Sequence, residues 1–583
     1  MPDLRERFPG RTPGPGAVRV HSPGRNRAGV VVKRIGFDGW PSGLLLAILL
    51  ALTPLPLPRL ALSGGLGESG AASTKGKGIE TPGDTLVTRL GAEPSTLNPI
   101  LATDAYAADV LGFVTESLLR RNPDTLELEP ELAESWEETP DHLTYVFRLR
   151  RDVRWHDGSP FTAEDVRFSF EKILDPSVDA AHLRNYYQDI ERVEVVDSWT
   201  VLFRYRRPYF RALEICGTIP LVPSHVYRGR NFNDHPQNRN PLGTGPYRFS
   251  RWETGRQIVL ERFPGYWGRP VFLDRIVFRI LTDGTVALQI LKKRELDWMG
   301  LTPLQWVRQT GSERFEERFV KLRFFEPYYS YIGWNARRPW FEDRRVRRAL
   351  TLLVDRRKIL ERLLFGMGVV VSGSAYVNSP EYDGSIAPLP YDPARAKDLL
   401  AEAGWTDHDG DGVLDRNGIP FRFEFLISAG SAFAEQLATI LKEDLSQVGI
   451  RMEIRKLEWA VFIQQIQERK FDAVTLGWSL SVESDPYQLW HSSQASGGSN
   501  FVGFANPEAD KIIEEARVTF DRNKRIALYH RFHRILHEEQ PYTFLFCTES
   551  LMALDRRFHN VQVHRLGLYP REWFVPAALQ RYP

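Results

Sequence analysis

The serines, acids and aromatic residues from Gly477 to Ser493 are a dense group of chemically useful side chains in the stretch GWSLSVESDPYQLWHSS. A nucleophilic serine of the α/β-hydrolase type needs the strained turn Gly-x-Ser-x-Gly. Here the residues from Gly477 to Ser481 end on serine instead of glycine, so that turn pattern is missing. A secreted hydrolase would have to use Glu483 or Asp485 with His491 as an acid–base pair. The alternative is that the stretch lines a binding pocket.

Other catalytic templates are also missing from the sequence. The pattern His-Glu-x-x-His of zinc proteases fails, because His537 is followed by Glu538, Glu539 and Gln540. Neither a P-loop nor a Rossmann glycine fingerprint occurs. The sequence therefore favours binding over catalysis, although many active sites leave no local pattern.

One segment, DHDGDGVLDRNG, has the spacing of a calcium-binding loop, and we call residues 407–418 the aspartate loop. Calcium loops supply oxygen ligands at alternate positions and a glycine at the sixth. The aspartate loop follows this spacing with Asp407, Asp409, Asp411 and Asp415. Gly418 stands at the twelfth position, where a bidentate glutamate is usual. Two structural roles stay open: a bound calcium ion, or a turn whose aspartates accept backbone N–H groups.

A second metal candidate is the set His530, His533 and His537, which the spacing places along one stripe of a helix. Such a stripe fits zinc or nickel. An apolar arc adjoins it, formed by Ile526, Tyr529, Phe532 and Leu536. We therefore favour histidines that border a packed helix face.

Bulk composition is that of a soluble globular protein, with 583 residues, 42% hydrophobic and 26% charged. The formal net charge of +2 gives no electrostatic reason to expect a nucleic-acid partner. The 15 Trp, 20 Tyr and 34 Phe suit either a large core or a concave site for an organic ligand. Cys216 and Cys547 are the two cysteines, and they form either a disulfide or two buried thiols.

Residues 1–63 form a basic N-terminal region followed by the apolar run GLLLAILLALTPLPL. The run is shorter than the about 20 residues that span a bilayer as a helix. A basic region and a short apolar core predict an export signal. The alternative is an uncleaved segment that tethers the protein to the membrane. Residues 64–83 predict a flexible linker.

Helices and strands alternate along the rest of the chain, which predicts an α/β fold. Period-two apolar residues predict a strand at 143–150, and a second strand is predicted at 450–457. Helices are predicted to follow Thr162, Asp343 and Asp392 as caps, and another to span 432–447. The helix after Asp343 is predicted to continue without a break to Gly366.

Four segments together resemble the extracellular solute-binding proteins of the peptide/nickel class, which serve ATP-binding-cassette importers. These segments are GAEPSTLNPI (Gly91–Ile100), FRLRRDVRWHDGSPFTAEDVRFSFEKILDP (Phe147–Pro176), GTGPYRFSRWETGRQIVLERFPGYWG (Gly243–Gly268) and YIGWNARRPWFEDRRVRRALTLLVDR (Tyr331–Arg356). The resemblance runs in order from about Asp84 to the C-terminus.

The resemblance implies a two-lobed periplasmic-binding-protein fold, in which mixed sheets are flanked by helices and a hinge joins the lobes. Lobe I would comprise 84–120, 241–325 and 521–583, lobe II would comprise 326–520, and an extra subdomain would occupy 121–240. The chain would cross between the lobes at Phe324–Ser330 and near Phe520. Ligand contacts would favour the closed arrangement of the lobes.

The resemblance also implies that the stretch from Gly477 to Ser493 lines the cleft. The family places Trp-x-x-Asp there, and its aspartate holds the free amine of a bound peptide. Trp478 is present with Ser479 beside it, but Ser481 stands in place of the aspartate. A serine cannot form an ion pair with an amine, and charge-assisted hydrogen bonds are roughly twice as strong as neutral ones. Glu483 or Asp485 could replace the aspartate if the loop is shifted.

The family places further residues near the cleft, each of which either contacts ligand or packs: Tyr106, Tyr328, Tyr329, Trp334, Asn378, Trp490 and Asn500. In the segment that matches best, we interpret a second set as helix caps and surface pairs: Asn335, Asp343, Arg347 and Asp355.

We therefore expect a non-enzymatic, exported, monomeric protein, periplasmic or at the cell surface, with no required cofactor. It would deliver a peptide-like solute to a membrane permease with cytoplasmic ATPase subunits. The same fold could instead bind a sugar oligomer, a nickel chelate or haem. A signalling receptor subunit is a further alternative, although no cytoplasmic output domain is visible in the sequence.

Overall fold

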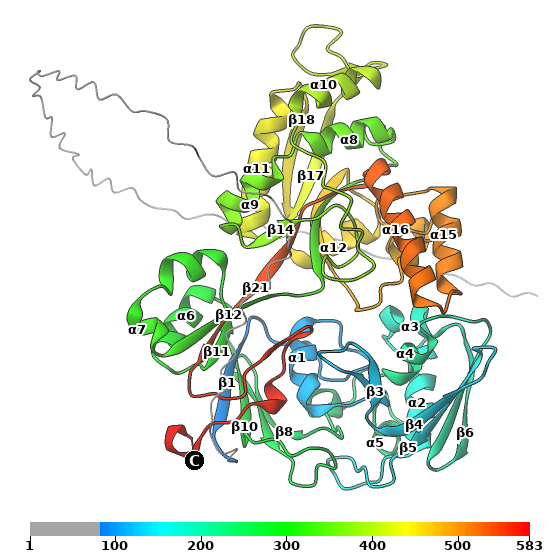
Figure 1. Ribbon diagram of the computed structural model, residues 1–583, viewed down its shortest axis with the longest axis vertical. Helices are drawn as coiled ribbons and strands as arrows, with labels where there is room; N and C mark the ends of the chain where they lie inside the picture. The colour runs from blue at the N-terminus through cyan, green and yellow to red at the C-terminus, as the bar shows by residue number, and fades with distance from the viewer. Residues whose placement is uncertain (1–81, 583) are drawn as a thin grey trace, which may run out of the picture. The chain divides into compact units, whose positions relative to one another are not determined.

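The computed structural model describes residues 82–582 (Figure 1). The predicted export signal lies outside the described residues, as does the linker up to residue 81. Within the described part, three sheets of four or more strands carry helices around them, so the predicted α/β class is confirmed. None of the helices in 82–582 is long and apolar enough to cross a membrane.

The first sheet has eight strands in the order β12-β21-β11-β1-β10-β9-β8, with β14 paired to β21. Strand β1 runs parallel to β10 and β11, and the outer pairings are antiparallel. Its strands are β1 (Thr85–Leu90), β8 (Tyr247–Glu253), β9 (Gln257–Arg262), β10 (Arg275–Ile280), β11 (Trp298–Gly300), β12 (Phe319–Phe325), β14 (Gly368–Val370) and β21 (Phe546–Asp555). The helices around it are α1 (Ala105–Val114), α6 (Gly284–Lys292) and α7 (Glu313–Glu316).

A buried arginine joins the two ends of the described chain within this first sheet. The Arg557 guanidinium is 3% exposed and donates to the Asp84 carboxylate at 3.0 Å, to the Asp297 carboxylate at 2.9 Å and to the Thr85 carbonyl at 2.9 Å. Both carboxylates are fully buried, so this cation compensates charges that would otherwise be costly to bury.

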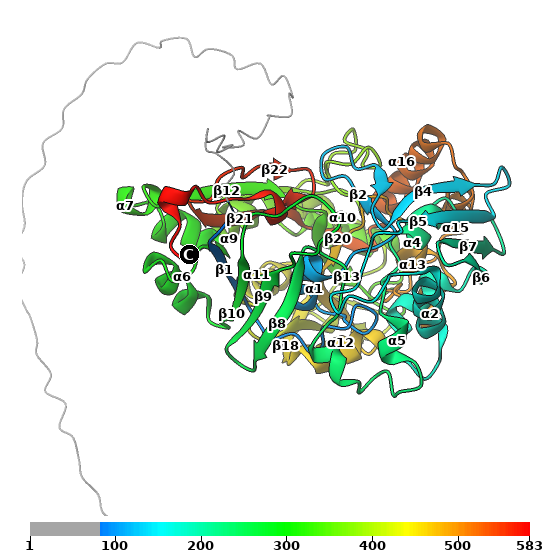
Figure 2. The ribbon, with the colours of Figure 1, turned by 90° about the horizontal axis from the view of Figure 1, so that it is seen from below.

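The segment between β1 and β8 forms a separate four-stranded antiparallel sheet in the order β4-β5-β7-β6 (Figure 2). Its strands are β4 (Ala133–Glu138), β5 (Thr144–Leu149), β6 (Ile190–Asp197) and β7 (Thr200–Tyr205). The helices beside it are α2 (Ala163–Leu174), α3 (Ala181–Tyr187), α4 (Ala212–Gly217) and α5 (Ser224–Tyr227). Tyr145, Phe147 and Leu149 are buried at alternate positions of β5, as the period-two pattern predicts.

The second large sheet has five strands in the order β18-β17-β19-β13-β20. They are β13 (Tyr328–Trp334), β17 (Arg422–Ser428), β18 (Arg451–Leu457), β19 (Ala473–Ser479) and β20 (Tyr542–Phe544). The longer helices of this region are α8 (Arg344–Leu352), α9 (Arg356–Leu364), α10 (Pro393–Glu402), α11 (Ala432–Ser446), α12 (Trp459–Gln467), α15 (Pro507–Arg517) and α16 (Arg522–Glu539). Short elements complete the fold: β2 (Leu119–Arg121), β3 (Leu128–Pro130), β15 (Asp415–Arg416), β16 (Ile419–Pro420), β22 (Val563–His564), β23 (Gly567–Leu568), α13 (Tyr487–Trp490) and α14 (Gln494–Gly497).

The chain passes between the two large sheets at two neighbouring places. Strand β12 ends at Phe325 and β13 begins at Tyr328, inside the predicted crossing. The return passage was expected near Phe520, but β20 still pairs with β13, and the chain reaches β21 only after Leu545. The apolar residues of α16 explain the difference, because they are buried in one cluster with Trp490 of α13 and Tyr331 of the second sheet. Strands β12 and β21 lie side by side in Figure 1.

The helix predicted to run from Asp343 to Gly366 is two helices, so that prediction is wrong. Asp355 interrupts it, because its carboxylate accepts a hydrogen bond from Lys358 N and caps α9. Aspartate favours such caps over helix interiors. The caps predicted at Thr162, Asp343 and Asp392 are confirmed.

Two residues interpreted as surface groups are instead buried. The Asn335 amide donates to the Phe471 carbonyl at 2.8 Å, and the Arg347 guanidinium donates to the Phe341 and Glu539 carbonyls. Both side chains tie chain segments together, since buried polar groups need partners. Cys216 and Cys547 are two buried free thiols.

Candidate functional site

A cavity of about 240 Å³ opens where the chain crosses between the two large sheets. From the first sheet and its C-terminal loop it is lined by Arg323, Glu549, Val563 and Arg565. From the second region it is lined by Tyr376, Asn378, Glu381, Val482 and Arg522. A neighbouring hollow of about 350 Å³ shares Pro327 and Leu566 with it and also touches Tyr328 and Ser479. We call these two hollows together the cleft.

The predicted Trp-x-x-Asp position lies at the end of β19, beside the cleft. Trp478 is half-buried and stacks on Tyr331 and Phe501, with ring centroids 6.4 and 6.0 Å apart. Ser479 is exposed and lines the cleft. The Ser481 hydroxyl is exposed and donates to the Glu483 carbonyl at 2.9 Å. Its side chain therefore stabilises the loop.

The two acids suggested as replacements for the family aspartate are both beside arginines. Asp485 accepts hydrogen bonds from the Tyr209 hydroxyl at 2.9 Å and from Arg517 Nε at 3.0 Å, and its side chain is 7% exposed. Glu483 lies 3.7 Å from the Arg525 guanidinium and 4.0 Å from that of Arg522. Neither carboxylate is a strong candidate for an incoming amine, because each already has a positive neighbour.

Among the other family positions, Tyr328 and Asn378 line the cleft. The Asn378 amide donates to the Tyr376 hydroxyl at 3.1 Å, which orients both polar groups at the cavity wall. Tyr106 lies elsewhere, packed against the core of the first sheet.

Four further positions are buried in cores. Tyr329 and Trp490 are each 1% exposed within one aromatic cluster. Trp334 donates to the Thr543 hydroxyl at 3.0 Å, and the Asn500 amide binds the Phe504 and His491 backbone. In this structure these side chains hold the second sheet together, and none of the four borders the cleft.

The groups suggested for a hydrolase have different hydrogen-bond partners. His491 contacts the Ser493 hydroxyl at 2.8 Å and the Glu514 carboxylate at 3.2 Å, whereas Asp485 is held by Tyr209 and Arg517. The histidines of α16 also have separate environments. His533 contacts the Ser372 hydroxyl at 3.0 Å, and His530 contacts the Pro380 carbonyl at 2.9 Å.

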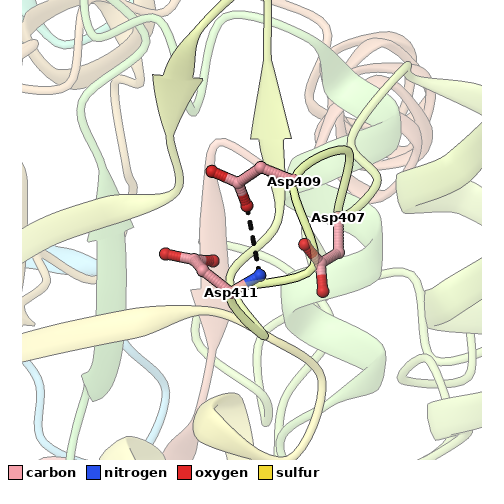
Figure 3. Close-up of side chains that lie close together, drawn as sticks. All are labelled: Asp407, Asp409 and Asp411. Carbon is pink, nitrogen blue, oxygen red and sulfur yellow. Dashed lines mark hydrogen bonds between the residues drawn. The ribbon is translucent and has the colours of Figure 1, made fainter.

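The aspartate loop brings three of its four predicted ligands together. One carboxylate oxygen from each of Asp407, Asp409 and Asp411 lies within 4.8 Å of the others, and all three side chains are exposed (Figure 3). They accept backbone N–H groups of the loop, for example Gly410 N on Asp407 at 2.8 Å. Asp415 instead contacts His408, at 3.0 Å. This geometry fits the turn interpretation and leaves calcium binding a prediction.

Asp109, on α1, is an acidic residue with a raised pKa. Part of the Asp109 side chain reaches solvent, and many protein atoms surround the rest of it. Burial, followed by the negative charges of Glu326 and Asp104, raises the pKa of Asp109 to about 6. Neighbouring carboxylates without a cation beside them favour the binding of a positively charged ligand group.

Comparison with known proteins gives the family. The sequence pattern of the bacterial extracellular solute-binding proteins, family 5 Middle, matches residues 127–500. The chain belongs to this family. It is 30% identical over 555 residues to the oligopeptide-binding protein AppA of Bacillus subtilis, covering 91% of this chain and 98% of the relative.

Solved structures of solute-binding proteins are similar to this chain over most of its length. The AppA structure from Bacillus subtilis, in complex with a nonapeptide, has a TM-score of 0.75 at 28% identity, covering 85% of this chain and 100% of AppA. NikZ of Campylobacter jejuni, in complex with Ni(L-His), has a TM-score of 0.73 at 26% identity, covering 84% and 99%. The two-lobed fold predicted from the sequence is confirmed.

Sequence reasoning missed Glu381, Arg522 and Arg565 as cleft residues of this solute-binding protein. None of them belongs to a recognisable motif, and each reaches the cleft from a different part of the chain. The one local signal in the sequence is weak: Glu381 directly follows a proline in the segment NSPEYDGS.

Proposed function

We propose that this solute-binding protein captures a peptide-like solute in the cleft between its two large sheets and delivers it to a membrane permease. The observation that supports this most is the composition of the cleft walls, which come from both large sheets and from the first crossing. A ligand held there contacts both lobes at once and therefore favours their closed arrangement. The relation to AppA, a protein solved with a nonapeptide, supports a peptide over other solutes.

Contacts outside the crossings can hold the lobes closed. Tyr209 follows β7 in the chain, and its hydroxyl donates to Asp485 of the second region at 2.9 Å. Phe210 N donates to the Arg517 carbonyl at 2.9 Å, and the His142 ring stacks on Phe520 with centroids 3.6 Å apart. We call the contacts of Tyr209 and Phe210 with Asp485 and Arg517 the latch. It forms only when the four-stranded sheet meets the second region.

Membership of the family supports the remaining parts of the proposal. The protein acts outside the cytoplasm as the binding component of an importer, either free or tethered by its N-terminal segment. Its partners are the permease and the ATPase subunits, and it acts as a monomer without catalysis.

Calorimetric titration of the protein, refolded to remove co-purified ligand, tests the proposal. Peptides of two to nine residues are the first titrants, and nickel with histidine is the second, because NikZ is solved with Ni(L-His). Micromolar or tighter binding of a peptide supports the proposal. Binding of nickel–histidine alone would replace peptide with a metal chelate as the solute, and sugar oligomers and haem would be tested next.

A further inference from the structure

Glu381 is a buried carboxylate at the wall of the cleft, in the segment between β14 and α10. The residue is 6% exposed. Its Oε2 atom has no hydrogen-bond partner among the described residues, and its Oε1 atom lies 3.8 Å from Arg522 Nη2, beyond hydrogen-bond distance. An ionised carboxylate is costly to bury without partners, so a native protein that keeps one has a use for it.

A small cavity of about 20 Å³ also borders Glu381, which lines the larger cavity as well. Its walls include Ser374, Ser484, Tyr529 and His533. The Tyr529 hydroxyl is also buried without a hydrogen-bond partner among the described residues. A space of this size holds one group as large as a water molecule. Two unpartnered oxygen atoms therefore border a space for one small polar group.

No side chain lining the small cavity supplies positive charge. Burial lowers the pKa of His533 to about 4, so its ring is neutral at neutral pH. Its ring nitrogens are also occupied, by the Ser372 hydroxyl at 3.0 Å and by Asp383 N at 3.2 Å. The nearest cation to Glu381 is thus Arg522, which Glu483 shares at 4.0 Å.

The other acids of the neighbouring loop already have positive partners. Asp485 is bonded to Arg517, and Glu483 lies between Arg522 and Arg525. On the opposite wall, Glu549 lies 3.7 Å from Arg323. Of these four acids, Glu381 is the one with a buried oxygen atom and no hydrogen-bonded partner among the described residues.

We propose that Glu381, with the Tyr529 hydroxyl, is a subsite for a primary ammonium group of the solute, in place of the aspartate that Ser481 replaces. This inference rests on the proposed function, because it assigns the amine end of a peptide-like solute. An ammonium group donates three hydrogen bonds and needs acceptors, and charge-assisted bonds of this kind are strong in a site shielded from water. A single water molecule in the small cavity is the competing occupant.

A carboxylate kept for ligand binding lowers the stability of the ligand-free protein, whereas a carboxylate kept for structure raises it. Glu381→Gln removes a buried charge without changing the shape of the side chain, so we expect the ligand-free variant to unfold at an equal or higher temperature than wild type. If Glu381 served to hold Arg522 in place, the same substitution would lower the unfolding temperature. Glu435→Gln is the control, since it removes a carboxylate of the second region that does not line the cleft.

The decisive experiment is calorimetric titration with alanine peptides of two to nine residues carrying a free or an acetylated N-terminus. We expect wild type to prefer the free amine at least ~30-fold, equivalent to about 2 kcal/mol. We expect Glu381→Gln to reduce that preference below ~3-fold and Glu435→Gln to leave it unchanged. Equal binding of both peptides by wild type, or an undiminished preference in Glu381→Gln, would overturn the inference.

A second measurement separates this inference from the proposed function. If no peptide binds, the peptide function fails, and thermal unfolding with methylammonium or tetramethylammonium chloride decides about the subsite. A rise with methylammonium alone, lost in Glu381→Gln, supports a subsite for another amine-bearing solute. Equal effects of the two salts on wild type would mean that the cavity holds only water. Should Glu381→Gln not fold, Tyr529→Phe takes its place, and an unchanged amine preference or methylammonium effect there overturns the inference.

Discussion

The latch gives a quantitative prediction about closure of the two lobes. Tyr209→Phe removes the hydroxyl that donates to Asp485 at 2.9 Å. Burial, and then the charge of Asp485, raise the pKa of Tyr209, so this hydroxyl stays protonated and donates. Asp485 keeps Arg517 Nε at 3.0 Å and Tyr487 N at 3.0 Å, so it is not left unpaired.

The expected loss is that of one hydrogen bond, about 1 kcal/mol, because both partners are hydrated when the lobes separate. The closed-to-open ratio should therefore fall about fivefold. Dyes on cysteines introduced at Glu191 and Lys442, both exposed, report this ratio by single-molecule fluorescence transfer. The native cysteines are buried, which protects them from labelling in the folded protein.

Tyr487→Phe is the matched control, because the Tyr487 hydroxyl contacts the Ser493 hydroxyl at 3.1 Å and, among the described residues, has no hydrogen bond to the four-stranded sheet. It should leave the ratio unchanged. If Tyr209→Phe also left it unchanged, the latch would not contribute to closure, and the crossings alone would set the balance. A fall of equal size in both variants would point to a general change in the loop.

Three further predictions concern stability. Arg557→Met should lower the free energy of unfolding by at least ~3 kcal/mol in urea titration, because Asp84 and Asp297 lose their buried cation; a loss under about 1 kcal/mol would contradict this. Asp109 has its pKa raised from 3.8 to about 6 in the folded protein, so its charge destabilises the fold above pH 6. Asp109→Asn should therefore exceed wild type in unfolding free energy at pH 7.5, by a margin that shrinks as pH falls from 6 towards 4; a constant margin would refute it. Millimolar calcium should shift the unfolding temperature no more than magnesium does, because the aspartate loop has Gly418 at its twelfth position; a shift specific to calcium would establish an ion site.

Local patterns predicted individual elements well. Period-two burial in β5 and the caps at Thr162 and Asp392 depend on residues close in sequence, and the structure has them as expected. The break at Asp355 was missed, because an apolar stripe continues across it while the capping hydrogen bond depends on a single side chain. The return passage was misplaced because the burial of α16 depends on Trp490 and Tyr331, which are distant in sequence.

The sequence by itself determined the fold class and the family, and it predicted that Ser481 replaces the family aspartate. These are properties of residue identity and order, which an ordered set of motifs records directly. Only the tertiary structure decided which acids are already paired and which one is not. Asp485 and Tyr209 form a hydrogen bond although they are 276 positions apart in the sequence. Glu381 and Tyr529 of α16 line the same small cavity. Charge compensation is a property of distance in space, and no local pattern encodes it.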